Sequence, residues 1–353
     1  MRVEELLLEA VRRKASDVLI SAGTAVHYHV FGRMERSEDG KILTTEESED
    51  LVYQLLTPLQ KKEFEQTLEL DLSFHLKDVS RFRVSVLRQK GAVGAVMRLV
   101  PLAIPRYTDL GIPERLLLQI VNTPNGLILV TGPTGAGKSS TVAAILNWMN
   151  TESEYPKHII TIEDPIEFLF PPRVCVVDQR EIGPDTKSYV NGLRSALRQM
   201  PHIIFVGEMR DRETMEIALT AAETGNLVIS TLSTQSASKT INRIIDVFPI
   251  EDQAEIRARL ALTLKVIVSQ VLLRRQDVEG RVAAREVLFV DSPVANLIRE
   301  GKIHQVDNVI SASGARGMVL LDDSLIELYQ QGIVSKADVL SRIQDAEKMR
   351  RLG

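Results

Sequence analysis

The stretch of the sequence with the clearest chemistry is GPTGAGKSS, residues 132–140. It fits the spacing G-x-x-x-x-G-K-[S/T], which binds nucleotide phosphates when a strand precedes it and a helix follows. Glycines let backbone N–H groups turn toward a phosphate, and the helix N-terminus adds partial positive charge. We expect Lys138 to bridge the outer phosphates of ATP and the Ser139 hydroxyl to hold Mg²⁺. The predicted ATP-binding residues are Gly132, Pro133, Thr134, Gly135, Ala136, Gly137, Lys138, Ser139 and Ser140.

Two acidic residues at the ends of apolar runs could complete a hydrolytic site. The run IIFVGE has Gly207 where the usual metal-binding strand ends in aspartate, and Glu208 follows it. We therefore expect Mg²⁺ to keep more of its waters, with Glu208 contacting it through one of them or positioning the attacking water. Glu163, in IITIEDPIE, could then polarise that water as a base. For each acid the alternative interpretation is a surface carboxylate or a helix N-cap. For Asp164, which precedes Pro165, a capping or turn role is as strong an interpretation as a functional one.

The elements around these residues indicate a parallel sheet. Apolar runs alternate with helical segments after residue 113. The alternative for residues 132–140 is a chance glycine-rich turn, but such a turn would lack the strand GLILVTG before it and the helix KSSTVAAILNWMN after it. Such strands are buried on both faces of a sheet, and ligands bind beyond their carboxyl ends. This rule places four residues at one edge: Gly132, Glu163, Glu208 and Ser233.

The chain divides into two parts at a proline-rich segment. Residues 1–100 predict an α+β domain with a small, mostly antiparallel sheet, helices over 3–14, 46–56 and 58–68, and two strands around the turn at Ala22-Gly23. Residues 101–113 hold three prolines and a glycine and are the predicted linker or hinge. Residues 114–353 form the predicted second domain, mostly helical after Ile250, with RVAAREVLFV as a strand element.

Composition narrows the class of protein. The 353 residues carry 43 basic and 47 acidic side chains, a net charge of −4, which gives no reason to expect a nucleic-acid partner. The single cysteine, Cys175, excludes an internal disulfide and a cysteine zinc site, fits a reducing cytosol, and is predicted to be a buried small hydrophobe. No window approaches the length of an apolar transmembrane helix.

The motifs together carry a family resemblance over nearly the whole chain. The runs GLILVTGPTGAGKSS, HIITIEDPIEF and VGEMRDRETMEIALTAAETG resemble the secretion ATPases of type IV pilus and type II secretion systems, most of all the twitching-motility, pilus-retraction type. ASDVLISAG and SRFRVSV resemble its PAS-like domain, and VANLIREGKIHQ and GMVLLDDSL resemble segments typical of the retraction type. The resemblance implies an α/β fold: a C-terminal RecA-like P-loop NTPase domain with a mostly parallel sheet, after an N-terminal α+β PAS-like domain.

The resemblance also implies site residues and an assembly. Members form hexameric rings in which arginines of the N-terminal domain reach the nucleotide; Arg83 and Arg98 resemble those arginines, and Arg81 is a weaker candidate. Without the resemblance, Arg81 and Arg83 would be interpreted as a solvated strand face. Glu163 matches the family's aspartate box and Glu208 its acidic strand. The implied catalytic set is Glu163, Glu208, Arg83 and Arg98.

One segment departs from the family. Its histidine box corresponds to residues 223–234, and the two histidines align with Asn226 and Ser233. A histidine near the γ-phosphate can donate a hydrogen bond and become cationic. An Asn amide can still donate, and a Ser hydroxyl could donate through a bridging water, but neither gains charge. We expect retained ATP binding with reduced or differently coupled hydrolysis.

The resulting functional hypothesis is a hexameric cytoplasmic ATPase motor that drives pilus retraction. The resemblance implies a peripheral position at the inner face of the cytoplasmic membrane, on an inner-membrane pilus platform protein, with a paralogous motor ATPase as a further candidate partner. One alternative is a weakly active nucleotide-binding ring subunit that modulates such a paralogue, which the missing histidines favour and the intact phosphate loop opposes. Another is a pilus-assembly or secretion ATPase, which one cysteine and a short N-terminus argue against.

Overall fold

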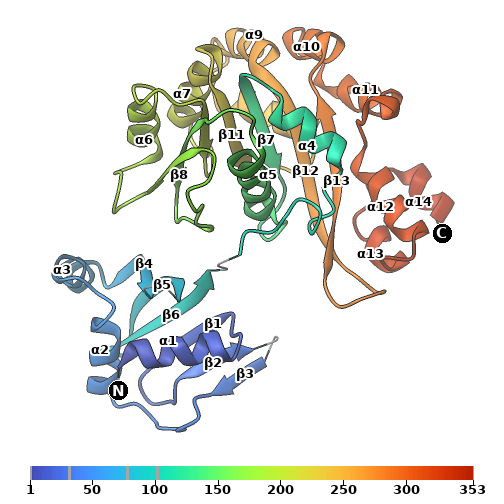
Figure 1. Cartoon of the computed structure of the whole chain (residues 1–353). Coiled ribbons are helices and arrows are strands. Elements are labelled where there is room, and N and C mark those ends of the chain that lie inside the picture. The colour runs from blue at the N-terminus through green and yellow to red at the C-terminus, as the bar shows by residue number, and fades with distance from the viewer. Residues whose placement is uncertain (1, 31–32, 77–78, 101–102, 353) are drawn as a thin grey trace. The chain divides into compact units, whose positions relative to one another are not determined.

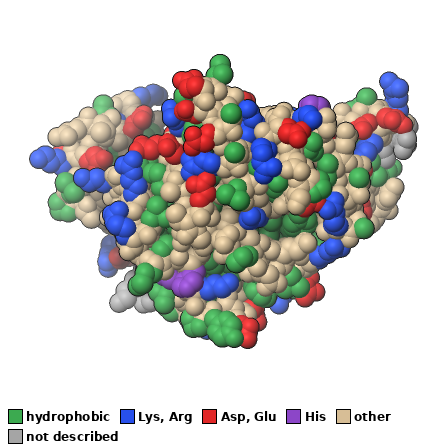
Figure 2. Space-filling model, turned by 90° about the horizontal axis from the view of Figure 1, so that it is seen from above, with side chains coloured by type: hydrophobic (Ala, Val, Ile, Leu, Met, Phe, Trp, Pro, Cys, Tyr) green, Lys and Arg blue, Asp and Glu red, His purple; other side chains and the backbone are tan. Residues whose placement is uncertain are grey.

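The computed structural model describes residues 2–30, 33–76, 79–100 and 103–352, which form two compact units, Met1–Ala103 and Ile104–Gly353 (Figure 1). Pro101 and Leu102 of the predicted linker lie outside the described residues. On the face that Figure 2 shows, Lys and Arg side chains are interspersed with Asp and Glu side chains.

The first unit is an α+β domain built on one antiparallel sheet of six strands, in the order β3-β2-β1-β6-β5-β4. Alternate residues of these strands are buried with the apolar faces of the helices, as in β5, where Phe82, Val84 and Val86 point inward. Its elements are α1 (Val3–Arg12), β1 (Asp17–Ile20), β2 (His27–Val30), β3 (Arg33–Arg36), α2 (Thr45–Tyr53), α3 (Pro58–Thr67), β4 (Glu69–Leu76), β5 (Ser80–Gln89) and β6 (Ala92–Val100).

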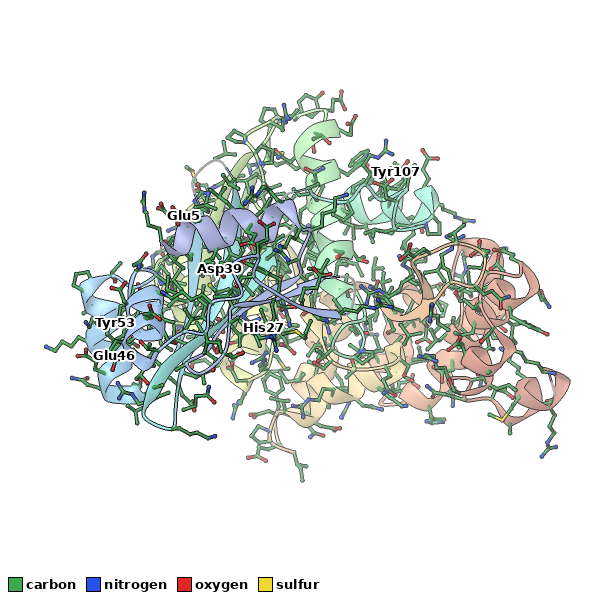
Figure 3. All side chains as sticks on the ribbon, turned by 90° about the horizontal axis from the view of Figure 1, so that it is seen from below. Glu5, His27, Asp39, Glu46, Tyr53 and Tyr107 are labelled. Carbon is green, nitrogen blue, oxygen red and sulfur yellow. The ribbon has the colours of Figure 1, made fainter. Side chains whose placement is uncertain are left out.

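Local sequence explains where two of these helices begin. Thr44 before α2 and Thr57 before α3 each accept a hydrogen bond from the backbone three residues on, and Glu47 and Gln60 return it. Tyr53, labelled in Figure 3, lies at the end of α2. Its ring packs edge-on against that of Phe64 on α3, with ring centroids 6.4 Å apart. The predicted antiparallel α+β domain is confirmed; the two strands expected around Ala22-Gly23 are in fact three, because residues 33–36 return as β3.

The second unit is an α/β domain on a sheet of seven strands, in the order β13-β12-β7-β11-β10-β8-β9. All neighbouring pairs are parallel except β12 with β13, which form a long antiparallel hairpin. The mostly parallel sheet predicted from the sequence is confirmed. Its strands are β7 (Gly126–Thr131), β8 (His158–Glu163), β9 (Val176–Glu181), β10 (Ile203–Val206), β11 (Leu227–Leu232), β12 (Leu264–Arg274) and β13 (Arg281–Phe289).

Helices cover both faces of this sheet, which is why its central strands β7, β10 and β11 are buried at every position. One face packs on α4 and α5, the other on α6 to α11, and the C-terminal helices pack on the outer part of the β12–β13 hairpin (Figure 1). The helices are α4 (Glu114–Val121), α5 (Lys138–Glu152), α6 (Tyr189–Ala196), α7 (Arg212–Glu223), α8 (Ala237–Asp246), α9 (Gln253–Thr263), α10 (Ser292–Arg299), η1 (Ile303–Gln305), α11 (Val306–Ala312), η2 (Gly314–Arg316), α12 (Leu321–Gln330), α13 (Lys336–Leu340) and α14 (Ala346–Leu352).

Two strands escaped the sequence prediction. β12 lies where helix was expected after Ile250, and β9 adds an edge strand whose sequence, VVDQRE, is polar at four of its six positions. Both contribute side chains to the site described below. Cys175, just before β9, is buried as predicted and contacts the Met149 carbonyl oxygen.

Part of the predicted linker belongs to the second unit. Tyr107, Leu110 and Ile112 pack with α4 and α5, and Tyr107 lies close to α4 in Figure 3. The buried guanidinium of Arg285 on β13 donates to the carbonyl oxygens of Leu110 at 2.7 Å and Gly111 at 2.9 Å. Residues 107–112 are therefore fixed to the sheet.

Candidate nucleotide-binding site

The loop between β7 and α5 has the geometry that its glycines predict. Gly132, Gly135 and Gly137 all adopt positive φ, at 147°, 79° and 83°. A Cβ on Gly132 would lie 2.2 Å from the carbonyl oxygen of Gln270, so only glycine fits there, whereas a Cβ on Gly135 would meet open space. β7 is buried along its whole length, and α5 begins at Lys138. The loop is thus held rigidly at the carboxyl end of a core strand.

Side chains from β12 and α5 brace this loop. The Gln270 amide donates to the carbonyl oxygen of Ala136 at 2.6 Å and accepts from the Thr141 hydroxyl at 2.9 Å. Lys138 Nζ donates to the carbonyl oxygens of Gly132 at 2.8 Å and Pro133 at 3.2 Å. Burial lowers the pKa of Lys138, and the charge of Glu208 opposes that shift. The ammonium therefore sits over the loop, where the outer phosphates of a nucleotide would lie.

The carboxyl ends of four parallel strands meet at the edge that carries this loop. Thr131 of β7 pairs with Leu232 of β11, and Val206 of β10 pairs with Ile162 of β8. The residues that end or follow these strands share that edge. They are the four that the sequence placed together: Gly132, Glu163, Glu208 and Ser233.

Glu163 is a buried carboxylate at this edge, with 6% of its surface exposed. Its Oε1 accepts hydrogen bonds from Thr161 Oγ1 at 2.7 Å and Gln179 Nε2 at 3.2 Å. Burial raises the pKa of Glu163 to about 7, although these two hydrogen bonds work in the opposite direction. A carboxyl group with a pKa near neutrality suits the transfer of a proton from water.

Glu208 differs from Glu163 because it is paired with charged and polar neighbours. Oε2 accepts from Arg210 Nε at 2.8 Å, and Oε1 accepts from Ser233 Oγ at 2.9 Å. Burial alone would raise the pKa of Glu208, but the hydrogen bonds from Arg210 and Ser233 and the charges of Arg210 and Lys138 lower it. Glu208 is therefore the ionised acid of the pair, and Glu163 the one that takes up protons near neutrality.

The histidine-box positions lie at opposite ends of β11. Ser233 is at the nucleotide edge but donates directly to Glu208. Asn226 precedes the strand, at the edge where Gly126 begins β7, and its amide donates to the Ala221 carbonyl oxygen at 3.1 Å. A strand of six residues spans about 20 Å. The expectation that Asn226 stands beside the γ-phosphate and can still donate to it was therefore wrong, because Asn226 lies at the far edge of the sheet.

Arg83 and Arg98 belong to the first unit, whereas the phosphate loop belongs to the second. The two arginines face each other across β5 and β6, and both are exposed. Arg98 Nε donates to Asp17 Oδ1 at 2.8 Å. Burial would raise the pKa of Asp17, but the hydrogen bonds from Arg98 and Ser16 lower it, so this pair is ionised. The two arginines thus form a basic pair with one member anchored.

The donors at this edge fit Mg²⁺ held mainly by nucleotide and water. Among the described residues no cluster of three or more His, Cys, Asp or Glu side chains suits a metal ion. One hydroxyl, that of Ser139 in the first turn of α5, and one ionised carboxylate, that of Glu208, are at hand. Mg²⁺ keeps several waters and binds through one or two protein ligands plus substrate phosphates, so this sparse set suits it.

This arrangement defines a P-loop nucleotide hydrolase, because a phosphate loop between a parallel strand and a helix shares one sheet edge with two carboxylates. Residues 2–350 match the family described as Type II/IV secretion system protein. The chain belongs to this family and is an ATPase.

Two named relatives and one solved structure are similar to this chain along nearly its whole length. It is 42% identical over 347 residues to the type IV pilus retraction ATPase PilT of Pseudomonas aeruginosa, covering 98% of this chain and 99% of that protein. It is 36% identical over 350 residues to the type IV pilus ATPase PilU of the same organism, covering 99% and 91%. A crystal structure of the pilus retraction motor PilT with bound ADP superposes with a TM-score of 0.93 at 40% identity, covering 99% of each chain.

Sequence reasoning gave no site role to Gln270, Gln179 or Arg210. Gln270 and Gln179 lie on the strands that were not predicted, so no local pattern linked them to the loop or to Glu163. Arg210 lies two residues after Glu208 and could have been found, since an arginine beside a strand-end acid is a common ion-pair partner.

Proposed function

We propose that this ATPase is the motor of type IV pilus retraction, working as a homo-hexamer in the cytoplasm at the inner face of the cytoplasmic membrane. The observation that carries the proposal is one sheet edge that holds Lys138, Glu163 and Glu208, in a chain similar over nearly its full length to a pilus retraction ATPase. Among the described residues no helix is long and apolar enough to cross a membrane. Membrane attachment then runs through a partner, for which we propose the pilus platform protein.

The chemistry follows from the two carboxylates. Residues 132–140 hold the phosphates of ATP, and Ser139, with Glu208 through a water, would hold Mg²⁺, which supplies charge neutralisation on the phosphates when bound. Glu163 takes a proton from the attacking water while the oxygen of that water bonds to the γ-phosphorus. The bond from that phosphorus to the bridging oxygen breaks, and its electron pair leaves with ADP. Glu163 then returns its proton to solvent.

Arg83 and Arg98 complete the proposed site from outside the ATPase domain. Both are exposed cations on one sheet face, and the Asp17 carboxylate holds Arg98 in a defined position. In a ring, such cations would stabilise the charge that develops on the transferred phosphate. Since residues 107–112 are fixed to the second unit, the described part of the predicted linker that is left for the hinge of the proposed motion is residues 103–106.

Deleting the gene in its own host tests the function. Cells without it should keep assembling pili but lose retraction, visible as hyperpiliation and as fluorescent pili that extend and stay extended. A plasmid copy should restore retraction, whereas a copy with Lys138→Ala should not. Normal retraction in the deletion strain would refute a motor role and leave the ATPase assignment intact.

A second candidate is a weakly active ring subunit that modulates a paralogous motor. The observation in its favour is Ser233, which donates to Glu208 where the family has a histidine near the γ-phosphate. Under this alternative the purified protein binds ATP but scarcely hydrolyses it alone, and gains turnover only when mixed with the paralogue. The remaining alternative, a pilus-assembly or secretion ATPase, is disfavoured by the single cysteine, which cannot build the zinc module usual in those enzymes.

A further inference from the structure

Gln179 on the edge strand β9 lies beside the buried carboxylate of Glu163. In the register of β8 and β9, Thr161 pairs with Gln179, and Glu163 pairs with Glu181. Side chains alternate along a strand, so Thr161 and Glu163 share one face of β8, and Gln179 lies diagonally across from Glu163 on that face. The neighbouring strand therefore brings an amide within reach of the carboxylate.

The amide of Gln179 has all its polar atoms engaged. Nε2 donates to Glu163 Oε1 at 3.2 Å and to the carbonyl oxygen of Phe168 at 2.8 Å, and Oε1 accepts from the Phe170 N–H at 2.8 Å. A backbone N–H can only donate, so the amide oxygen must face Phe170. That fixes the orientation of the amide and turns its NH₂ group toward Glu163. The Gln179 side chain thereby connects residues 168–170 to the Glu163 carboxylate.

Thr161 acts on the same carboxylate oxygen. Its hydroxyl donates to Glu163 Oε1 at 2.7 Å, so two side-chain donors from adjacent strands converge on Oε1. A carboxylate held at one oxygen cannot rotate freely about its last torsion, and its second oxygen keeps a fixed direction. Hydrogen bonds donated to a carboxylate also favour its charged form over its neutral form.

We propose that Gln179 is a positioning residue for ATP hydrolysis: its amide fixes the Glu163 carboxylate and stabilises its charged form. The inference rests on the proposed role of Glu163 as the base. It predicts that the pH at which turnover is half-maximal depends on a residue other than the base itself.

The electrostatic surroundings set the size of the effect. Burial raises the pKa of Glu163 to about 7, the hydrogen bonds from Thr161 and Gln179 lower it, and the charge of Glu167 raises it. Across β9, Glu181 is engaged with the Ile166 N–H at 3.0 Å. From α6, the half-buried Tyr189 is the titratable neighbour, and burial, with help from nearby carboxylates including Glu163, raises its pKa. Tyr189 is therefore neutral across the working range, and Glu163 is the group that titrates.

The test is the pH profile of kcat for full-length Gln179→Met. Losing the amide donor should move the acidic limb upward by about one pH unit relative to wild type. The rate should then fall about tenfold at pH 6 and less than about twofold at pH 9, with little change in the KM for ATP. Thr161→Val should shift the limb in the same direction. Gln253→Met is the matched control. The Gln253 amide also donates to a carbonyl oxygen, that of Phe248 at 3.1 Å, but Gln253 lies on α9 and makes no contact with Glu163 among the hydrogen bonds of the described residues.

Two further variants keep the outcome decisive. If Gln179→Met does not fold, Gln179→Glu retains an acceptor for the Phe170 N–H while removing the donor, and should also move the limb upward. A limb that stays in place, or a loss of rate that is equal at all pH values, overturns the positioning role. Glu163→Gln measured in the same series separates the two claims, since undiminished turnover in that variant means that Glu163 is not the base.

Discussion

Replacing Gly132 by alanine tests the geometry of the phosphate loop at its tightest point. The added Cβ would lie 2.2 Å from the Gln270 carbonyl oxygen and 2.9 Å from the Ala136 Cβ, and φ at this position is +147°. Comfortable carbon contacts lie at about 3.5–4.0 Å, so β12 or the loop must move by more than an ångström. Gly135→Ala is the control, because its φ is +79° but its Cβ would meet nothing within 4 Å.

The expected magnitudes separate the two variants. Gly135→Ala carries only the backbone term for a left-handed residue, about 1–2 kcal/mol. Gly132→Ala adds an overpacking term of about 1–3 kcal/mol to a backbone term of about 1–3 kcal/mol, for a loss of about 4 kcal/mol. For a domain of this size, about 2–4 °C of melting temperature corresponds to each kcal/mol. We expect Gly132→Ala to melt about 8–16 °C below wild type and Gly135→Ala about 2–8 °C below.

Thermal unfolding followed by circular dichroism, with and without ATP and Mg²⁺, measures both effects. Gly132→Ala should also lose the stabilisation that nucleotide gives the wild type, because the loop that binds it has moved. If Gly132→Ala melts no lower than Gly135→Ala and still binds ATP, the close contact between the loop and β12 does not exist in the folded protein, and the reasoning fails.

Three other predictions address the acids, the altered histidine box and the arginines. Glu163→Gln should stabilise the fold at pH 8 by about 3 kcal/mol and have little effect near pH 4. The pKa of Glu163 is raised from 4.5 to about 7 by folding, so its ionisation costs stability as pH rises through that window, and chemical denaturation at both pH values checks this. Ser233→His alone should carry any gain in turnover, and Asn226→His none, because only Ser233 lies at the nucleotide edge; equal gains in steady-state kcat would contradict the placement of Asn226. Mixing Arg98→Ala with Glu163→Gln subunits should recover part of the turnover that each lacks alone if Arg98 acts on a neighbouring subunit, and no recovery would place its action elsewhere.

The sequence predicted the parts of the site that are local in the chain. The phosphate loop and Glu163 follow directly from apolar runs that end in a loop or an acid, and the rule for parallel strands brought Glu208 and Ser233 to the same edge. The same rule, applied with strand direction, also excludes Asn226, since it precedes β11 and parallel strands begin at the far edge.

The parts that could not be predicted depend on tertiary pairing. Gln270 reaches the loop across 134 residues of sequence, on a strand whose apolar run LKVIVSQVLL is equally consistent with a buried helix. Gln179 reaches Glu163 only because β9 joins the sheet edge in one register, and a slip of one residue would turn it to the other face. Arg285, which fixes residues 110 and 111, gives no signal until β13 is placed beside them.

The most direct test of the central claim is steady-state ATP hydrolysis by the purified protein beside its Glu163→Gln, Glu208→Gln double variant. We predict that the wild type hydrolyses ATP and that the double variant binds ATP with nearly unchanged affinity but turns over at least about a thousandfold more slowly, the usual scale for losing a base and a charged site group together. Hydrolysis by the double variant within about tenfold of wild type would contradict the assignment of both acids, and with it the account of how this edge of the sheet works.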